Sequence, residues 1–292
     1  MLFVSCGSSK RNILNTKTSN DNTILNSTST DVTFKTSAEN FDSYLPLLKD
    51  KRVGIVTNQT GILSKEKHLV DFLIEQNINL QKIYAPEHGF RGTADAGELI
   101  VDGKDTKTNL PIISLYGNNK KPKPEQLEGI DILIFDLQDV GARFYTYISS
   151  LHYVMEACAE NNIPLLVLDR PNPNGTIIDG PILEKEHKSF VGMHEIPVLH
   201  GMTIGEYAKM INGEKWLKDS LQCDLKVAPC LNYSHDMKYS LPVKPSPNLP
   251  NDQSINLYAS LCFFEGTNVS LGRGTEKQFQ IYGSPFLPES EF

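Results

Sequence analysis

Residues 79–98 read NLQKIYAPEHGFRGTADAGE, and this stretch decides the fold. Its first seven residues form an apolar run that predicts a buried strand, and a charged run with three glycines follows directly. The charged run begins with Glu87, His88 and Arg91. In open α/β sheets, ligands bind at the carboxyl ends of the strands. The stretch therefore predicts a parallel sheet and a candidate site at its edge.

Strands and helices alternate around this stretch. Four more apolar runs predict strands, at 52–61, 110–117, 131–138 and 163–171. Helical spacing of apolar residues predicts helices at 65–76, 123–130 and 147–162. Alternation of this kind is typical of an α/β fold with a doubly wound parallel sheet. We expect this N-terminal domain to span 41–174.

The alternation is lost after Asn174, where proline and glycine become frequent. A helix at 203–213, a strand at 223–229 and a segment at 255–266 are the clearest elements there. We therefore expect a second, smaller, less regular α+β domain over 175–292. The chain ends at PESEF without a closing element, from which we expect this domain to be incomplete at its end.

The first 40 residues differ from the rest. MLFVSCGSSK resembles the end of a lipoprotein signal, with Cys6 as the residue that would carry the lipid. Polar residues dominate from Gly7 to Asn40 and cannot bury enough apolar surface to offset the entropy of ordering. We expect residues 1–40 to be a signal remnant and a disordered tether, and the protein to be a periplasmic or surface lipoprotein of the cell envelope.

Charge and composition exclude several classes of function. The formal net charge of −7 leaves no basic surplus to neutralise nucleic-acid phosphates, so we expect no nucleic-acid partner. Contact with a membrane is expected only through the lipid at Cys6. Neither GxGxxG nor GxxxxGKS follows the first strand, so no cofactor is expected.

Polar side chains follow four of the predicted strands, where they would meet at one edge of the sheet. Asparagine, glutamine, carboxylate and arginine side chains in these positions favour a shared ligand site. The candidates are Asn58, Glu87, His88, Arg91, Asp136, Gln138, Arg143, Asp169 and Asn172.

The region after Asn174 offers further candidates, namely His194, His200, Arg273 and Glu276. Tyr145 could stack on the face of a sugar ring or simply pack. The histidines suggest zinc, but no HExxH or comparable pattern is present, so no metal is expected.

Several motifs together resemble one known family. They are TNQTG, PEHGFRG, SLYG, FDLQDVGARFYTY, LDRPNPNG, SFVGMHEIPVLHGMTIGE, PSPN and LCFFEGTNVSLGRGTEKQF, and the resemblance runs from about Val53 to Pro285. The chain is similar here to exo-β-N-acetylmuramidases of the NamZ type. The resemblance implies a hydrolase that releases terminal N-acetylmuramic acid from the non-reducing end of peptidoglycan fragments, in cell wall recycling. It also implies a Rossmann-like N-terminal domain joined to a smaller C-terminal one, with the active site in the cleft between them. Glu87 is the catalytic candidate that the resemblance implies.

Glycoside hydrolysis usually needs one carboxylic acid and a second carboxylate, and the sequence supplies carboxylates at the predicted edge. We assign Glu87 as general acid/base, with Asp136 and Asp169 as leading candidates for its partner and Asp139 and Glu276 also eligible. The substrate's own 2-acetamido group could replace a protein nucleophile. The expected ligands are MurNAc-GlcNAc and muropeptides.

Arginine side chains suit the lactyl carboxylate of muramic acid, and Arg91, Arg143 and Arg273 are the candidates. Arg143 could instead form an ion pair with Asp136 or Asp139. Two other functions stay open. One is a non-catalytic sugar-binding lipoprotein, and the other is a metal-dependent amide or ester hydrolase that uses His88, His194 and His200.

Overall fold

A computed structural model describes residues 33–64, 67–91, 102–286 and 290. Cys6, most of the predicted tether and the end of the charged run beyond Arg91 lie outside the described residues. Within these ranges, every helix is too short or too polar to cross a bilayer.

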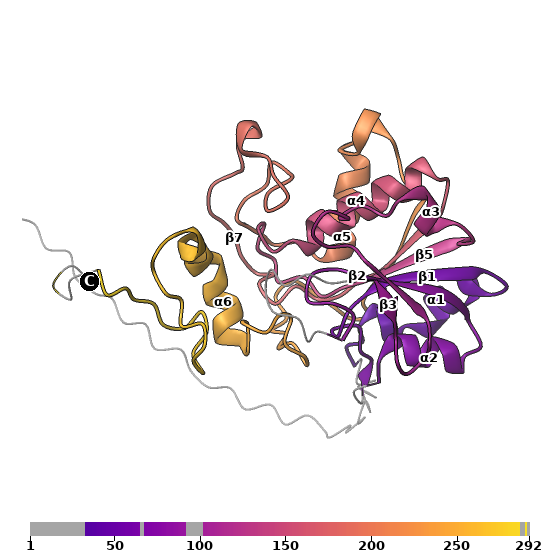
Figure 1. The fold of residues 1–292 in the computed structure, drawn as a ribbon, viewed down its shortest axis with the longest axis horizontal. Coiled ribbons are helices and arrows are strands. Elements are labelled where there is room, and N and C mark those ends of the chain that lie inside the picture. Colours follow the sequence, from indigo (N-terminus) through magenta and orange to yellow (C-terminus); the bar gives the residue numbers. More distant parts are fainter. Residues whose placement is uncertain (1–32, 65–66, 92–101, 287–289, 291–292) are drawn as a thin grey trace, which may run out of the picture. The chain divides into compact units, whose positions relative to one another are not determined.

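A seven-stranded sheet with the strand order β3-β4-β2-β1-β5-β6-β9 forms the centre of the fold (Figure 1). All neighbouring strands pair in parallel except β3, which pairs with β4 in the antiparallel direction. The strands are β1 (Arg52–Thr57), β2 (Asn79–Ala85), β3 (Gly103–Lys104), β4 (Pro111–Ser114), β5 (Ile132–Asp136), β6 (Leu165–Leu168) and β9 (Leu225–Ala228). The predicted α/β fold with a mainly parallel sheet is confirmed.

Both faces of the sheet are buried. Successive side chains of a strand point to opposite faces, so each face contributes to its own apolar cluster. Val53 and Ile55 of β1 belong to one apolar cluster, whereas Val56 belongs to the other. The first cluster includes the buried side chains of α1 (Phe41–Leu48) and α2 (Leu69–Glu75). The second includes those of α4 (Tyr147–Glu160) and α5 (Ile204–Gly213). Figure 1 shows the two helix pairs on opposite sides of the sheet.

The shorter elements connect this framework. They are η1 (Ser37–Glu39), α3 (Pro124–Leu127), β7 (Ile178–Asp179), η3 (Lys185–His187), β8 (Leu199–His200) and η4 (Lys218–Ser220). β7 and β8 form a separate antiparallel pair. α6 (Asp252–Leu261) and η5 (Cys262–Gly266) follow β9. A capping box between Thr203 and Glu206 begins α5, which fixes the start of this helix.

Two segments pack differently from the sequence expectation. The strand predicted at 223–229 forms, but it pairs with β6 and thus extends the sheet of the N-terminal part. Residues 33–40 are not part of a free tether, because Lys35 bridges to Leu231 and Ala38 is fully buried. The domain boundary near Asn174 remains a prediction.

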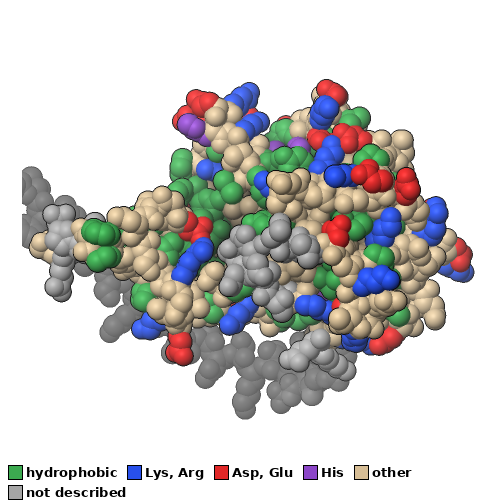
Figure 2. Space-filling model, in the orientation of Figure 1, with side chains coloured by type: hydrophobic (Ala, Val, Ile, Leu, Met, Phe, Trp, Pro, Cys, Tyr) green, Lys and Arg blue, Asp and Glu red, His purple; other side chains and the backbone are tan. Residues whose placement is uncertain are grey.

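Aromatic side chains attach α6 to the loop that follows β5. Tyr258 of α6 packs edge-on against Phe144 and Tyr145, with ring centroids 5.3 and 5.9 Å apart. Phe279 also packs against Tyr258, with the ring centroids 5.2 Å apart. Such pairs add to the free energy of burying their area. On the face drawn in Figure 2, acidic and basic side chains are interspersed.

Candidate active site

A cavity of about 650 Å³ lies at the carboxyl edge of the sheet. Its lining comes from the loops after β2, β4 and β5, from residues 189–191 and from residues between 246 and 279. This is the edge at which parallel sheets bind ligands. The volume lies within the range of small-molecule sites.

Glu87 lies two residues beyond β2 and lines this cavity half-buried. The Tyr116 hydroxyl donates a hydrogen bond to Glu87 Oε1 over 3.1 Å. Burial and the neighbouring Glu87 carboxylate raise the pKa of Tyr116, which keeps this hydroxyl a proton donor. The Glu87 carboxyl is therefore oriented from the loop after β4.

The backbone of the same turn is also fixed. The Tyr147 hydroxyl donates a hydrogen bond to the Glu87 carbonyl oxygen over 3.5 Å. The Asn58 side-chain amide donates to this hydroxyl over 2.7 Å. His88 has φ 73° and Gly89 has φ 74°, so two consecutive residues occupy the left-handed region. A residue with a Cβ adopts this conformation at an energetic cost, which surrounding contacts must offset. His88 also lines the cavity.

The lining residues between 246 and 279 include the Glu265–Arg273 ion pair, so this carboxylate and this guanidinium neutralise each other. Lys120 lines the cavity from the loop after β4, with its Nζ 4.5 Å from the centroid of the Phe190 ring. Phe144, Tyr145, Tyr258 and Phe279 supply aromatic lining. Rings and a few polar groups in a cavity are typical of sites that bind small polar molecules.

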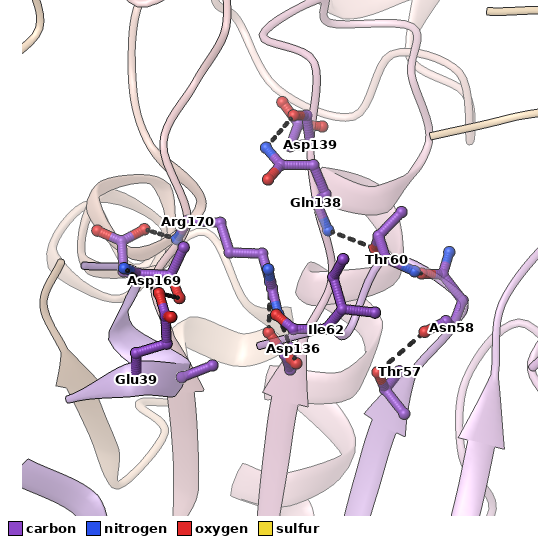
Figure 3. Close-up of polar contacts among 12 residues, drawn as sticks. Glu39, Thr57, Asn58, Thr60, Ile62, Asp136, Gln138, Asp139, Asp169 and Arg170 are labelled. Carbon is purple, nitrogen blue, oxygen red and sulfur yellow. Dashed lines mark hydrogen bonds and ion pairs between the residues drawn. The ribbon is translucent and has the colours of Figure 1, made fainter. Parts of the chain in front are cut away.

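Asp136 does not line this cavity. It ends β5 without exposed surface and forms a two-point ion pair with Arg170 (Figure 3). Arg170 Nη2 also donates to the backbone oxygen of Ile62. The structure thus places Asp136 in a buried link between strand ends, outside the group that surrounds Glu87.

Asp169 also lies outside the cavity lining, at the beginning of α5. Its carboxylate accepts hydrogen bonds from the Thr203 hydroxyl and the Gly205 backbone N–H, each 2.8 Å long. Burial raises the pKa of Asp169 to about 6, against the opposing effect of these hydrogen bonds. A Cβ at Gly205 would lie 2.7 Å from Asp169 Cγ, so this contact requires glycine. A carboxylate at a helix N-terminus is a stabilising arrangement.

Gln138 and Asn172 form hydrogen bonds with backbone groups around these strand ends. The Gln138 amide donates to the carbonyl oxygens of Asp139 and Pro171, and the Asn172 amide donates to that of Met202. Gly141 has φ 78°, and a Cβ there would lie 2.3 Å from Asn172 Oδ1. The two side chains stabilise the loops behind the cavity and do not line it.

Arg143 lies outside the cavity lining. Its guanidinium donates to the carbonyl oxygens of Pro181 and Ile196, and it pairs with neither Asp136 nor Asp139. Arg91 binds Asp105 through two nitrogens and lies outside the Glu87 cavity. Both guanidinium groups are thus bound by residues that are distant in the sequence, and sequence spacing alone does not reveal such partners.

The histidines do not gather into a metal centre. His194 contacts His152 at 2.9 Å and the Tyr207 hydroxyl at 2.8 Å, and it stacks on Trp216. Burial lowers the pKa of His194 to about 3, so the ring is neutral at ordinary pH. His200 lies 3.4 Å from Asp139 instead. Across the described ranges, no group of three potential ligands is placed to hold a metal ion.

The structure brings four of the predicted residues together in one cavity, and they are Glu87, His88, Tyr145 and Arg273. Glu276 is exposed and does not belong to the lining. Sequence reasoning did not assign Tyr116 or Lys120, although Tyr116 lies in SLYG, one of the motifs singled out. Its position after β4 was the available signal, because that strand ends at the same edge.

Two family models match the chain. Residues 53–253 match the model described as exo-beta-N-acetylmuramidase NamZ, N-terminal. Residues 256–292 match the corresponding C-terminal model. Over 254 residues the chain is 48% identical to the peptidoglycan beta-N-acetylmuramidase NamZ of Bacillus subtilis (strain 168). That alignment covers 85% of this chain and 60% of the relative, so the chain spans about three fifths of the relative's length.

Two solved structures are also similar, both of DUF1343 family proteins from Bacteroides fragilis NCTC 9343. One is 51% identical with a TM-score of 0.79, and the alignment covers 87% of this chain and 67% of that structure. The other is 36% identical with a TM-score of 0.79, and it covers 89% of this chain and 67% of that structure. The two family-model matches, over residues 53–253 and 256–292, together include the residues that line the cavity.

Proposed function

The chain belongs to the NamZ family of exo-beta-N-acetylmuramidases, and from this premise we propose that it is a glycoside hydrolase that releases terminal N-acetylmuramic acid from the non-reducing end of peptidoglycan fragments. The substrates would be MurNAc-GlcNAc and related glycans. The observation that carries the proposal is the position of the Glu87 carboxyl in an aromatic-lined cavity at the sheet edge.

Glu87 is the general acid in this proposal. Its carboxyl group protonates the glycosidic oxygen as the bond to the anomeric carbon breaks, and the departing sugar leaves as an alcohol. Among the described residues that line the cavity, Glu265 is the other carboxylate, and it is held by Arg273. Asp136 and Asp169 are engaged elsewhere, so neither is carried forward as the partner.

The second chemical role then falls to one of two groups. If Glu265 acts as base on a water molecule, the product forms with inversion. If the substrate's 2-acetamido oxygen attacks the anomeric carbon, the product forms with retention. Proton NMR of the first product formed from a β-linked substrate distinguishes these outcomes, because it reports the anomer before mutarotation.

The activity itself is tested with a MurNAc-terminated tetrasaccharide labelled at its reducing end. An exo-acting enzyme releases free N-acetylmuramic acid first and leaves a labelled trisaccharide. Labelled disaccharides as the first products would indicate an endo-acting enzyme. A chain that binds the glycan without cleaving it would instead fit a sugar-binding protein.

We also propose that the protein is a lipoprotein of the cell envelope, anchored through Cys6. The support is the apolar stretch before Cys6 and the polar stretch after it. Replacing Cys6 by serine in the natural gene should move the protein from the membrane fraction to the soluble one. Unchanged membrane association of the variant would refute the anchor.

A further inference from the structure

Lys120 differs from the other cation in the cavity lining. Arg273 is neutralised by Glu265, whereas no ion pair joins Lys120 to a carboxylate of the described residues. The Lys120 ammonium instead lies over the Phe190 ring. Both residues are half-buried, and a cation–π contact contributes about 0.5–2 kcal/mol, which leaves the ammonium N–H groups available to a carboxylate.

The backbone around Lys120 is fixed on both sides. The Asn119 side-chain amide donates to the Ser114 carbonyl oxygen over 2.6 Å. Lys121 donates to Glu156 and Glu160 of α4, each over 2.7 Å. Lys120 therefore projects from a loop that is attached to both β4 and α4.

The same loop orients the catalytic candidate. Tyr116, four residues before Lys120, donates to Glu87 Oε1. One loop thus supplies the hydrogen bond to the proposed general acid and a cation on the wall of the same cavity. In the proposed function, the sugar whose glycosidic oxygen lies at Glu87 would occupy the cavity that Glu87 and Lys120 both line.

We infer that Lys120 binds the lactyl carboxylate of N-acetylmuramic acid and is a residue that selects this sugar over N-acetylglucosamine. The inference rests on the proposed function, since it identifies how that site distinguishes its substrate. The two sugars differ by the lactyl ether, so its carboxylate is the group that a cation can recognise. Of the arginines predicted for this role, Arg91 and Arg143 lie outside the cavity and Arg273 is paired with an acid.

The test pairs variants of Lys120 with two substrates. The substrates are para-nitrophenyl β-N-acetylmuraminide and the same compound with its lactyl group converted to the neutral amide. With Lys120→Met, kcat/KM for the acid substrate should fall roughly 10- to 100-fold, the range for a hydrogen bond between charged groups. The amide substrate should be cleaved equally by wild type and variant. Lys120→Arg should retain most of the preference for the acid, because it retains the positive charge.

Lys209→Met is the matched control, because Lys209 is exposed on α5 and does not line the cavity. It should leave both rates unchanged. Equal losses on the two substrates with Lys120→Met, or no loss on either, would overturn the inference.

Failure of the proposed function gives a different result, because wild type would then cleave neither substrate. In that case the inference is decided by calorimetry with free N-acetylmuramic acid and its lactyl amide. Tighter binding of the acid that Lys120→Met abolishes supports the carboxylate contact. Equal binding of the two ligands by wild type overturns it.

Discussion

Arg170 binds both carboxylate oxygens of Asp136, with Nε 2.6 Å from Oδ1 and Nη2 3.0 Å from Oδ2. Both side chains are almost fully buried, at the ends of β6 and β5. Removal of two charges from water is costly, and good geometry is needed to offset that cost. Asp136, which the sequence offered as a candidate partner of Glu87, is therefore a structural link between neighbouring strand ends.

Arg170→Met should strongly destabilise the protein, since it leaves the Asp136 charge buried without a partner. We expect the free energy of unfolding to fall by about 3–5 kcal/mol, measured by urea denaturation. The double variant Asp136→Asn/Arg170→Met should recover part of this loss. Arg52→Met, which breaks the exposed pair with Asp131, is the control and should have a much smaller effect. Unchanged stability of Arg170→Met would contradict the structural role.

Tyr116→Phe should lower kcat about 10-fold with little change in KM, because the lost hydrogen bond orients Glu87 and does not hold the substrate. Steady-state kinetics on a MurNAc-GlcNAc disaccharide measure both constants, because the departure of its sugar leaving group depends on general acid catalysis. Tyr44→Phe is the matched control, since it removes a hydroxyl that donates to the Ala38 carbonyl oxygen over 2.9 Å, away from the cavity. It should reduce stability without a specific loss of kcat. A Tyr116 variant that raises KM alone would refute the orienting role.

The sheet could be predicted from the sequence because its strands are continuous apolar runs. NLQKIYA forms β2 with the predicted bounds, and the helix predicted at 147–162 appears as Tyr147–Glu160. These patterns reflect burial on two faces, which local composition records directly. The edge at which Glu87 lies followed from the parallel topology.

The partners of the polar residues could not be predicted in the same way. Asp136, Gln138 and Asn172 lie at the expected strand ends, but they bind an arginine or backbone carbonyl groups there. Which of several adjacent polar groups faces the cavity depends on tertiary contacts across 30 or more residues of chain. The lining residues Tyr258 and Arg273 come from a region without regular alternation, so local patterns did not assign them, and the family resemblance alone implied a cleft between two domains.

The free energy of unfolding should fall in acid, because His194 is buried as the neutral ring. Burial, with smaller effects of His152 and Lys188, lowers the pKa of His194 from 6.5 to about 3. Between these values the unfolded chain binds the proton and the folded chain does not, so stability rises with pH. The contribution is fully present above about pH 6.5 and is lost progressively toward pH 3. At pH 5 the expected loss relative to pH 7.5 is about 2 kcal/mol.

Urea denaturation of wild type and His194→Gln at the two pH values measures this effect. The variant lacks the titrating ring, so its stability should change by about 2 kcal/mol less between pH 7.5 and pH 5. His187→Gln, at an exposed position, is the control and should keep the wild-type dependence. If His194→Gln retains the full wild-type pH dependence, another group is responsible.

Glu87→Gln should abolish most activity while the protein stays folded. The amide keeps the shape of the side chain and can still accept the Tyr116 hydrogen bond through its oxygen, but it has no proton to transfer to the glycosidic oxygen. Loss of general acid catalysis should lower kcat roughly 10²–10⁴-fold on a natural disaccharide. The loss should be much smaller on a nitrophenyl glycoside, because that leaving group departs with little need of a proton.

Asp169→Asn is the contrasting variant. It alters a carboxylate that binds Thr203 and the start of α5, so it should change stability and not the ratio of rates on the two substrates. Near wild-type turnover of the disaccharide by folded Glu87→Gln would remove Glu87 from the acid role, and Glu265, the other carboxylate among the described lining residues, would then be its candidate.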